Sequence, residues 1–231
     1  MSSHPKFPSI NFSQTTWLSD SLVNFLAHCM LADKASFQWK CSSEQRDGLL
    51  AGAIIGDFHK GKVKQAWPSD LVAGIILHRR IDALSNKNES ARSTSSFYPK
   101  ELRRFAPIYF DILTDHFLAN HWACWSKGAL KDLTSDTYNA LNRFGAYIPK
   151  KNMEFVSFMR KEDLLAGYQR WSNIELATSG VMRRLGRPEL FVPSIQSMSS
   201  ALKKCEISFR SCLNELLDHT ANWNAFDSIN N

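Results

Sequence analysis

The sequence has few of the features that mark a secreted, disulfide-bonded protein. Its 231 residues include five cysteines, an odd number, and no two of them form a C-x-x-C pair. This pattern disfavours both a disulfide framework and a zinc knuckle, so we expect the protein to work in a reducing compartment. The cysteines are Cys29, Cys41, Cys124, Cys205 and Cys212.

Long apolar segments are missing as well. No stretch approaches the roughly 18 uncharged apolar residues that a membrane-spanning helix needs. The first residues lack the basic segment and following apolar run that mark a signal peptide. We therefore expect a cytoplasmic protein with no membrane partner.

Strand-like alternation of apolar and polar residues is almost absent, and there is no internal repeat or low-complexity tract. Hydrophobic residues make up 44% of the chain and charged residues 22%, an ordinary globular composition. A chain of this length buries enough surface to fold without a disulfide or a structural metal. These features predict an all-α fold, a single-domain helical bundle.

The expected segments follow from apolar spacing and from the positions of proline and glycine. In the first half of the chain they are a mobile polar arm over 1–20, a helix from 21 with Ser19 or Asp20 as its N-cap, a loop over 33–44, a helix from 49 ending near 61, and a helix from 68 through 82. A short basic helix between Pro99 and Pro107 follows, and then a helix with Pro107 in its first turn that runs to 122. The remaining helices are expected over 134–146, 162–172, 174–186 and 194–218, with turns at 150–152 and 186–188.

The formal net charge is +6, and the positive charge is uneven. Residues 59–104 contain ten Lys or Arg and four Asp or Glu. A basic face attracts an anionic partner, which could be nucleic acid, a membrane or an acidic protein. The alternative is a solvated charged face without a partner.

Carboxylates and histidines stand in apolar helices where hydrophobic residues would be expected. Asp57 ends one helical stripe, and His28 lies in a second apolar helix. His78 with Asp82, and Asp111 with Asp115, are spaced four residues apart, which puts each pair on one helix face.

Several buried carboxylates that converge on one core are costly unless they share cations. Histidine together with aspartate suits Mn²⁺, Fe²⁺ or Zn²⁺. In a two-metal site such ions clamp a phosphoryl group and activate water, which suits phosphodiester hydrolysis.

Each motif also has a purely structural interpretation. His78 and Asp82 can form a salt bridge along one helix, and His28 can be a hydrogen-bonded core histidine. The like-charged pair of Asp111 and Asp115 needs a positive group nearby, which Arg103 or Arg104 could supply without a metal. His116 points about 100° away from Asp115 and fits a supporting position behind a metal ligand.

At these residues the chain resembles the acyl-carrier-protein phosphodiesterases, also called ACP hydrolases. The matching segments are Asn24-Phe25-Leu26-Ala27-His28, Gly56-Asp57-Phe58 with Lys60-Gly61, Gly74-Ile75 with Leu77-His78-Arg79 and Ile81-Asp82, and Ala106-Pro107-Ile108 with Asp111, Asp115-His116-Phe117-Leu118 and Trp122, followed by a weaker match at Leu165, Tyr168 and Met182-Arg183-Arg184-Leu185. Their order and spacing are kept from Val23 to about Leu217, which covers nearly the whole chain.

The resemblance implies a helical fold related to the HD phosphohydrolases, with the usual ligand order rearranged. It implies a divalent metal, typically Mn²⁺, and holo-acyl carrier protein, an acidic protein, as the partner in place of nucleic acid. The implied reaction is holo-acyl carrier protein plus water giving apo-acyl carrier protein plus 4′-phosphopantetheine.

The resemblance also implies roles for single residues. Asp57 is the acidic residue expected to be indispensable. The remaining candidates for holding the metal and handling water are His28, His78, Asp82, Asp111, Asp115 and His116. Asp57, His78 and Asp82 are thus predicted both as metal ligands and as catalytic residues, together with Lys60 and Arg79. Those two, like Arg103 and Arg104, are basic groups that either stabilise transition-state charge or receive the acidic carrier.

The chain departs from the family's pattern in three places. The family usually starts near Val23, so we expect an N-terminal extension over 1–22, a catalytic domain over 23–220 and a tail over 221–231. The loop over 33–47 is longer than usual. A second histidine that is common on the first helix is Met30 here, about 200° around the helix from His28.

Two other functions remain open. A different HD-type metal phosphohydrolase would act on nucleotides and share the metal site. A non-catalytic basic helical protein would bind an acidic protein or nucleic acid, with its carboxylates paired to arginines.

Overall fold

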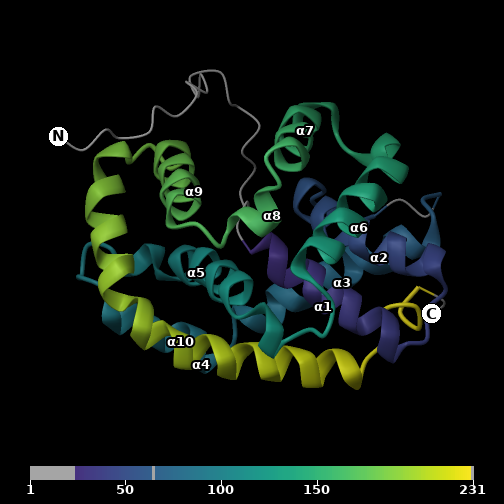
Figure 1. The fold of residues 1–231 in the computed structure, drawn as a ribbon, viewed down its shortest axis with the longest axis horizontal. Helices are drawn as coiled ribbons and strands as arrows, with labels where there is room; N and C mark the ends of the chain where they lie inside the picture. The colour runs from purple at the N-terminus through teal and green to yellow at the C-terminus, as the bar shows by residue number, and fades with distance from the viewer. Residues whose placement is uncertain (1–23, 64–65, 230–231) are drawn as a thin grey trace.

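A computed structural model describes residues 24–63 and 66–229 of the chain. The elements in these residues are helices, without a strand, so the all-α prediction is confirmed (Figure 1). The α-helices are α1 (Phe25–Gln38), α2 (Ser43–Ile55), α3 (Ser69–Ser85), α4 (Glu89–Ser93), α5 (Ala106–Asn120), α6 (Leu130–Arg143), α7 (Met153–Lys161), α8 (Leu164–Gly167), α9 (Trp171–Arg184) and α10 (Phe191–Ala221). Short 3₁₀ turns connect several of them.

Helix α1 lies at the centre of the bundle and has neighbours on every side. Its residues from Phe25 to Ala32 are all buried, because α2, α3, α5, α6 and α10 pack around it. A helix that is apolar all round belongs in the core of a larger domain. The long helix α10 runs along the edge of the molecule and packs on α5, α1 and α9 (Figure 1).

Helices α2 and α3 approach each other closely because glycines face each other across the contact. A Cβ atom placed on Gly52 would lie 2.5 Å from the backbone of Gly74, and one placed on Gly48 would lie 2.5 Å from the Cβ of Asp70. Only glycine permits this distance. The close packing fixes the end of α2 against the middle of α3, where the candidate site lies.

The expected loop over 33–44 is wrong. Helix α1 continues to Gln38, because Ala35 and Ser36 are still buried in the core. Helix α2 already begins at Ser43, and its N-cap is a capping box. The Ser42 side chain accepts a hydrogen bond from the Gln45 N–H, and the Gln45 side chain accepts one from the Ser42 N–H. These two contacts satisfy two N–H groups of the first turn.

Other helix boundaries in the structure differ from the predicted ones by a few residues or more. The helix expected over 134–146 is α6, and those over 174–186 and 194–218 are α9 and α10. A helix over 162–172 is wrong, since a chain reversal at Asp163, with φ 44°, separates α7 from the short α8. Helix α7 was not expected; the turn at 150–152 is a 3₁₀ turn that leads into it. The predicted helix start at Ser21, its N-cap and the polar arm over 1–20 lie outside the described residues.

The segment after α10 packs on the body of the protein. Trp223 and Phe226 each meet the ring of Trp39 edge-on, at 6.1 and 6.2 Å between centroids, and Ala225 is fully buried. The Trp39 indole N–H donates to the carbonyl of Thr220. The tail predicted over 221–231 therefore contributes to the core as far as residue 229.

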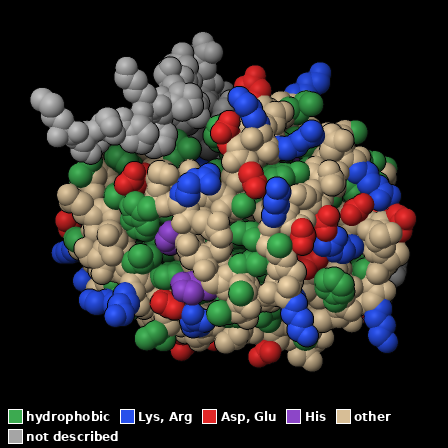
Figure 2. All heavy atoms as spheres, viewed as in Figure 1, with side chains coloured by type: hydrophobic (Ala, Val, Ile, Leu, Met, Phe, Trp, Pro, Cys, Tyr) green, Lys and Arg blue, Asp and Glu red, His purple; other side chains and the backbone are tan. Residues whose placement is uncertain are grey.

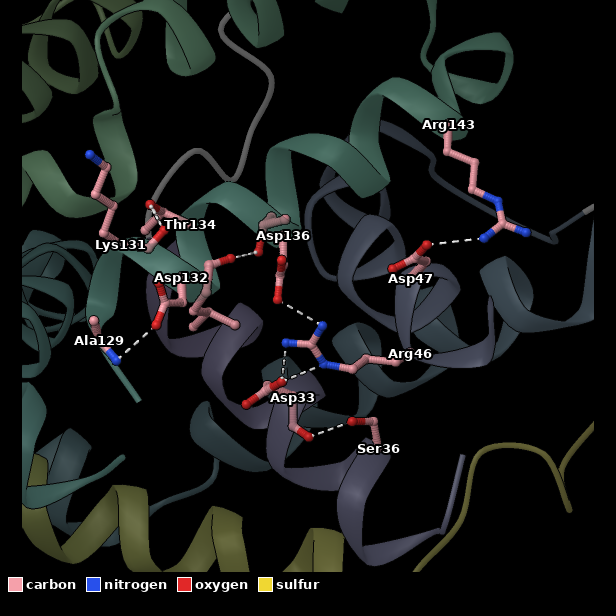
Figure 3. Close-up of polar contacts among 12 residues, drawn as sticks. Asp33, Ser36, Arg46, Asp47, Ala129, Lys131, Asp132, Thr134, Asp136 and Arg143 are labelled. Atoms are coloured by element: carbon pink, nitrogen blue, oxygen red, sulfur yellow. Dashed lines mark hydrogen bonds and ion pairs between the residues drawn. The ribbon is translucent and has the colours of Figure 1, made fainter. Parts of the chain in front are cut away.

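A half-buried ion group joins α1, α2 and α6. The guanidinium of Arg46 binds Asp33 at 2.7 Å and Asp136 at 2.9 Å, as Figure 3 shows. A neighbouring pair, Arg143 with Asp47 at 3.0 Å, joins α6 to α2 at a more exposed position (Figure 3). Along the described part of the chain, none of the helices has the length and apolar character to cross a membrane.

Candidate metal centre

Four of the predicted site residues meet in the structure. His28 comes from α1, Asp57 from the 3₁₀ turn Gly56–Phe58 that directly follows α2, and His78 and Asp82 from one face of α3. The Nε2 atom of His28 lies 3.1 Å from Asp82 Oδ1, and the Nε2 atom of His78 lies 3.3 Å from Asp82 Oδ2. His78 Nε2 also lies 3.5 Å from Asp57 Oδ1.

The two histidine rings are stacked, with 4.1 Å between their centroids. Their position depends on the contact between α2 and α3, because a Cβ on Gly56 would lie 2.6 Å from the ring of His78. Both histidines are buried, whereas the side chain of Asp82 is 41% exposed. The group therefore opens to solvent on the Asp82 side.

The ring of His78 is held in one orientation by the backbone. Its Nδ1 atom lies 2.9 Å from the carbonyl oxygen of Ala53, which can only accept a hydrogen bond, so Nδ1 carries the proton. This contact directs Nε2 towards the two carboxylates. A backbone acceptor behind the ring is the usual support for a histidine that binds a metal through its other nitrogen.

The donor set fits a divalent cation. One ligand atom each from His28, His78 and Asp82 can be chosen so that all lie within 4.8 Å of one another, and no other such group occurs among the described residues. Two buried atoms of the site, His28 Nδ1 and Asp57 Oδ2, have no hydrogen-bond partner in the described part of the chain. Buried polar atoms without partners are costly, and a cation that engaged Asp57 Oδ2 would remove one such cost.

The pKa values of these side chains follow from their burial and from the short distances between them. Burial opposes a charged imidazole, but the carboxylates of Asp57 and Asp82 outweigh it and raise the pKa of His78 to about 10. Burial and the neighbouring His78 lower the pKa of His28. The hydrogen bonds of both histidines outweigh the burial of Asp82 and lower the pKa of its carboxyl. Without a cation, a proton on His78 compensates the carboxylates, and a divalent ion can take its place.

Asp111, on α5, is not among the clustered ligand atoms, but its carboxyl is close enough to feel the charges of the group. Burial raises the pKa of its carboxyl well above the usual value, and the nearby carboxylates of Asp82, Asp115 and Asp57 raise it further. It lines a small hollow that it shares with Ser85 and Arg92. A third carboxylate at this place strengthens the case for a cation between the helices.

The comparisons with known proteins agree on one family. The family model "Acyl carrier protein phosphodiesterase" matches residues 23–216. The chain belongs to the acyl carrier protein phosphodiesterase family. An acyl carrier protein phosphodiesterase of Enterobacter sp. (strain 638) is 30% identical over 190 residues, which cover 81% of this chain and 92% of the relative.

Two further relatives of the same name show the same likeness. The protein of Escherichia coli O6:H1 is 31% identical over 169 residues, covering 73% of this chain and 81% of the relative. That of Shigella boydii serotype 18 is 39% identical over 101 residues, which cover 44% and 47% of the two chains. No solved structure matches the chain.

The resemblance to this phosphodiesterase family suggested further site residues, and some of them lie outside the group of His28, Asp57, His78 and Asp82. Asp115 is fully buried, and its two oxygens accept hydrogen bonds from the N–H groups of Leu26 and Ala27, each at 2.9 Å. These are first-turn N–H groups of α1, which has no N-cap side chain of its own, since Asn24 has φ 81° and makes no capping bond. Asp115 thus caps α1 from another helix.

His116 is also engaged away from the cluster. Its Nδ1 donates to the carbonyl of Tyr168 at 2.7 Å, and its ring meets that of Trp171 edge-on. Arg79 donates to the carbonyls of Gly61 and His59, both at 2.7 Å, and so fixes the loop after Asp57. Lys60, which is exposed, lies on this loop.

The two arginines that could have neutralised the pair of Asp111 and Asp115 contact other groups. Arg103 donates to the carbonyl of Tyr98, and Arg104 lies over the ring of Phe105. Met30 is buried in the core and is not among the clustered ligand atoms.

Two residues near the site carry no spacing signal in the sequence. Burial lowers the pKa of Arg184, and the carboxylate of Asp57 acts in the opposite direction, which places this guanidinium near Asp57. Tyr168 is buried, and its pKa is raised by burial and by carboxylates that include Asp115 and Asp57. Only the resemblance to the family singled out either residue.

Proposed function

We propose that this protein hydrolyses the phosphodiester that joins 4′-phosphopantetheine to holo-acyl carrier protein, with a divalent cation held by His28, His78 and Asp82. The observation that carries the proposal is the convergence of these side chains with Asp57, in a chain that belongs to the acyl carrier protein phosphodiesterase family. The substrate is the one that the names of the relatives state.

The cation would neutralise phosphate charge and increase the acidity of water. Mixed imidazole and carboxylate ligands suit Mn²⁺, Fe²⁺ or Zn²⁺, and of these we propose Mn²⁺. Asp111, whose carboxyl feels the charges of Asp82 and Asp57, is the candidate for a second point of attachment. Asp115 and His116 have other partners in the structure, so we propose supporting roles for them.

Asp57 is the proposed general base. Its Oδ1 faces His78, while its Oδ2 is buried without a hydrogen-bond partner among the described residues. This oxygen is available to accept the proton of the water that attacks phosphorus. Attack forms the new phosphorus–oxygen bond and breaks the bond to the serine oxygen of the carrier, which takes a proton from solvent as it leaves.

The basic groups around the site have separate tasks in this proposal. Arg79 is a positioning residue, because its two bonds hold the loop over 59–61. Lys60 on that loop faces an incoming anionic substrate. We also propose a cytoplasmic location, which accords with the five unpaired cysteines.

The test is the mass of purified holo-carrier after incubation with the protein and Mn²⁺. Wild type should remove the mass of the phosphopantetheine group, and Asp57→Ala should leave the carrier intact. A panel of nucleotides is incubated in parallel. Release of phosphate from a nucleotide, with no change in the carrier, would assign the site to a nucleotide phosphohydrolase and refute the proposal.

A further inference from the structure

The corner between α9 and α10 combines positive charge with exposed apolar side chains. Within residues 183–192 there are three arginines and one glutamate. Arg183 is exposed, and the side chain of Arg187 is 41% exposed. Between them and after them, Leu185 is 40% and Val192 57% exposed, two of the few large apolar residues on the described surface.

This corner has a defined shape. Helix α9 ends in a Schellman motif, in which the Arg187 N–H donates to the Met182 carbonyl and the Gly186 N–H to the Arg183 carbonyl. Gly186 has φ 66°, a conformation that favours glycine. The start of α10 is fixed to α5 by a buried hydrogen bond of 2.6 Å between the hydroxyls of Tyr109 and Ser194.

Other groups add positive charge at the corner between α9 and α10. Helix α10 has no acidic residue in its first turn, so the partial positive charge of its N-terminus is offset only in part, by Glu189 two residues before it. Arg187 pairs with Glu189, and Arg104 also acts on this carboxyl; their charges lower the pKa of Glu189. Arg104, in the segment before α5, thus adds a positive charge that acts on this carboxyl.

One helix of the corner packs against a helix that carries a candidate site residue. Helix α9 packs on α5, the helix of Asp111, and on α10 (Figure 1). The last residue of α9, Arg184, is half-buried and feels the charge of Asp57. The exposed Arg183 and Leu185 flank Arg184 at the end of this helix.

We infer that this corner, Arg183, Leu185, Arg187 and Val192, is the surface on which the protein binds the acidic carrier protein that bears the phosphodiester. The inference rests on the proposed function for the identity of the partner. Arginine with exposed aliphatic side chains is the composition of a protein interface, and the charge selects a negative partner. Figure 2 shows the molecule from the side of Figure 1, with basic and acidic side chains mixed over this face.

The test measures binding apart from hydrolysis. Fluorescently labelled apo-carrier, which has no bond to cleave, is titrated with the full chain at low salt, and its anisotropy is followed. Arg183→Glu/Arg187→Glu should bind roughly tenfold more weakly or worse, with a smaller salt dependence. The control Lys127→Glu/Lys131→Glu makes the same change in net charge at exposed positions before and on α6, which packs on α2, and should bind within about twofold of wild type.

The outcomes separate the two proposals. Equal affinities for wild type and Arg183→Glu/Arg187→Glu overturn the docking surface, even if wild type hydrolyses holo-carrier. Equal losses for both double variants also overturn it, because net charge alone would then draw the carrier. Selective loss of carrier binding without any turnover by wild type supports the surface and refutes the hydrolase. Binding of RNA or anionic vesicles that exceeds carrier binding, and is lost in the same variant, assigns the corner to that partner instead.

Discussion

At the scale of single residues, Asp57 and Asp115 are both buried carboxylates with different partners. Asp115 has its two oxygens occupied by N–H groups of α1. Asp57 has one oxygen facing His78 and one without a partner in the described residues. The first arrangement stabilises a helix, and the second is prepared for a ligand.

This difference predicts that the same change, aspartate to asparagine, affects stability more at Asp115 than at Asp57. Asp115→Asn places an amide NH₂ against a backbone N–H of α1, and we expect it to lower the free energy of unfolding by about 2 kcal/mol. Asp57→Asn should change the free energy of unfolding of the metal-free protein by less than about 1 kcal/mol. Urea unfolding followed by circular dichroism measures both. Equal losses in the two variants would contradict the assignment.

Most of the candidate metal centre could be predicted from the sequence, and one part could not. His28, Asp57, His78 and Asp82 interrupt apolar helices, and the spacing of four puts the last two on one face. The same spacing places Asp111 and Asp115 together, but it says nothing of the start of α1. The hydrogen bonds that Asp115 accepts from the start of α1 depend on the tertiary fold, since residues 26 and 115 are far apart in the sequence.

At the scale of helices, the contact between α2 and α3 positions the site. Gly52→Ala would put a methyl group 2.5 Å from the backbone of Gly74 and force the helices apart. We expect a loss of about 2–3 kcal/mol in the free energy of unfolding, together with weaker metal binding. Gly145→Ala is the control, because nothing lies within 4 Å of its added Cβ and its φ is not positive. A change within about 0.5 kcal/mol for Gly52→Ala would refute the close contact.

The ion group of Arg46 gives a second prediction at this scale. Arg46→Met leaves Asp33 and Asp136 without their shared cation in a half-buried place, and we expect a loss of about 1–3 kcal/mol. Arg143→Met removes the more exposed pair with Asp47 and should cost less than about 0.5 kcal/mol. Thermal unfolding of the two variants side by side measures the difference. A larger loss in Arg143→Met would contradict it.

Some of the helix boundaries could be predicted from the sequence. The capping box of Ser42 and Gln45 marks the start of α2 and is incompatible with a loop through residue 44. Pro107 was correctly placed in the first turn of α5. The end of α7 at Asp163 has no comparable signal, because the left-handed position after a helix, where the Asp163 N–H donates to the carbonyl of Arg160, is usually occupied by glycine or asparagine.

At the scale of the whole molecule, a cation that binds between α1 and α3 should stabilise the fold. At a free Mn²⁺ concentration of about one hundred times the dissociation constant, we expect the free energy of unfolding to rise by about 2.7 kcal/mol. Asp82→Asn removes one ligand and should abolish the rise, while Asp47→Asn, on the surface of α2, should keep it. Thermal unfolding with and without Mn²⁺ reports the shift. An identical shift in all three proteins would mean that Mn²⁺ binds elsewhere.

The most direct measurement is the anomalous scattering of Mn²⁺ in a crystal of the protein. The account predicts a peak between the Nε2 atoms of His28 and His78 and the carboxylate of Asp82, with Asp57 beside it. It also predicts that the peak is absent in Asp82→Asn. A crystal grown in saturating Mn²⁺ with no peak at these side chains, or with its peak at a distant surface, would contradict the account.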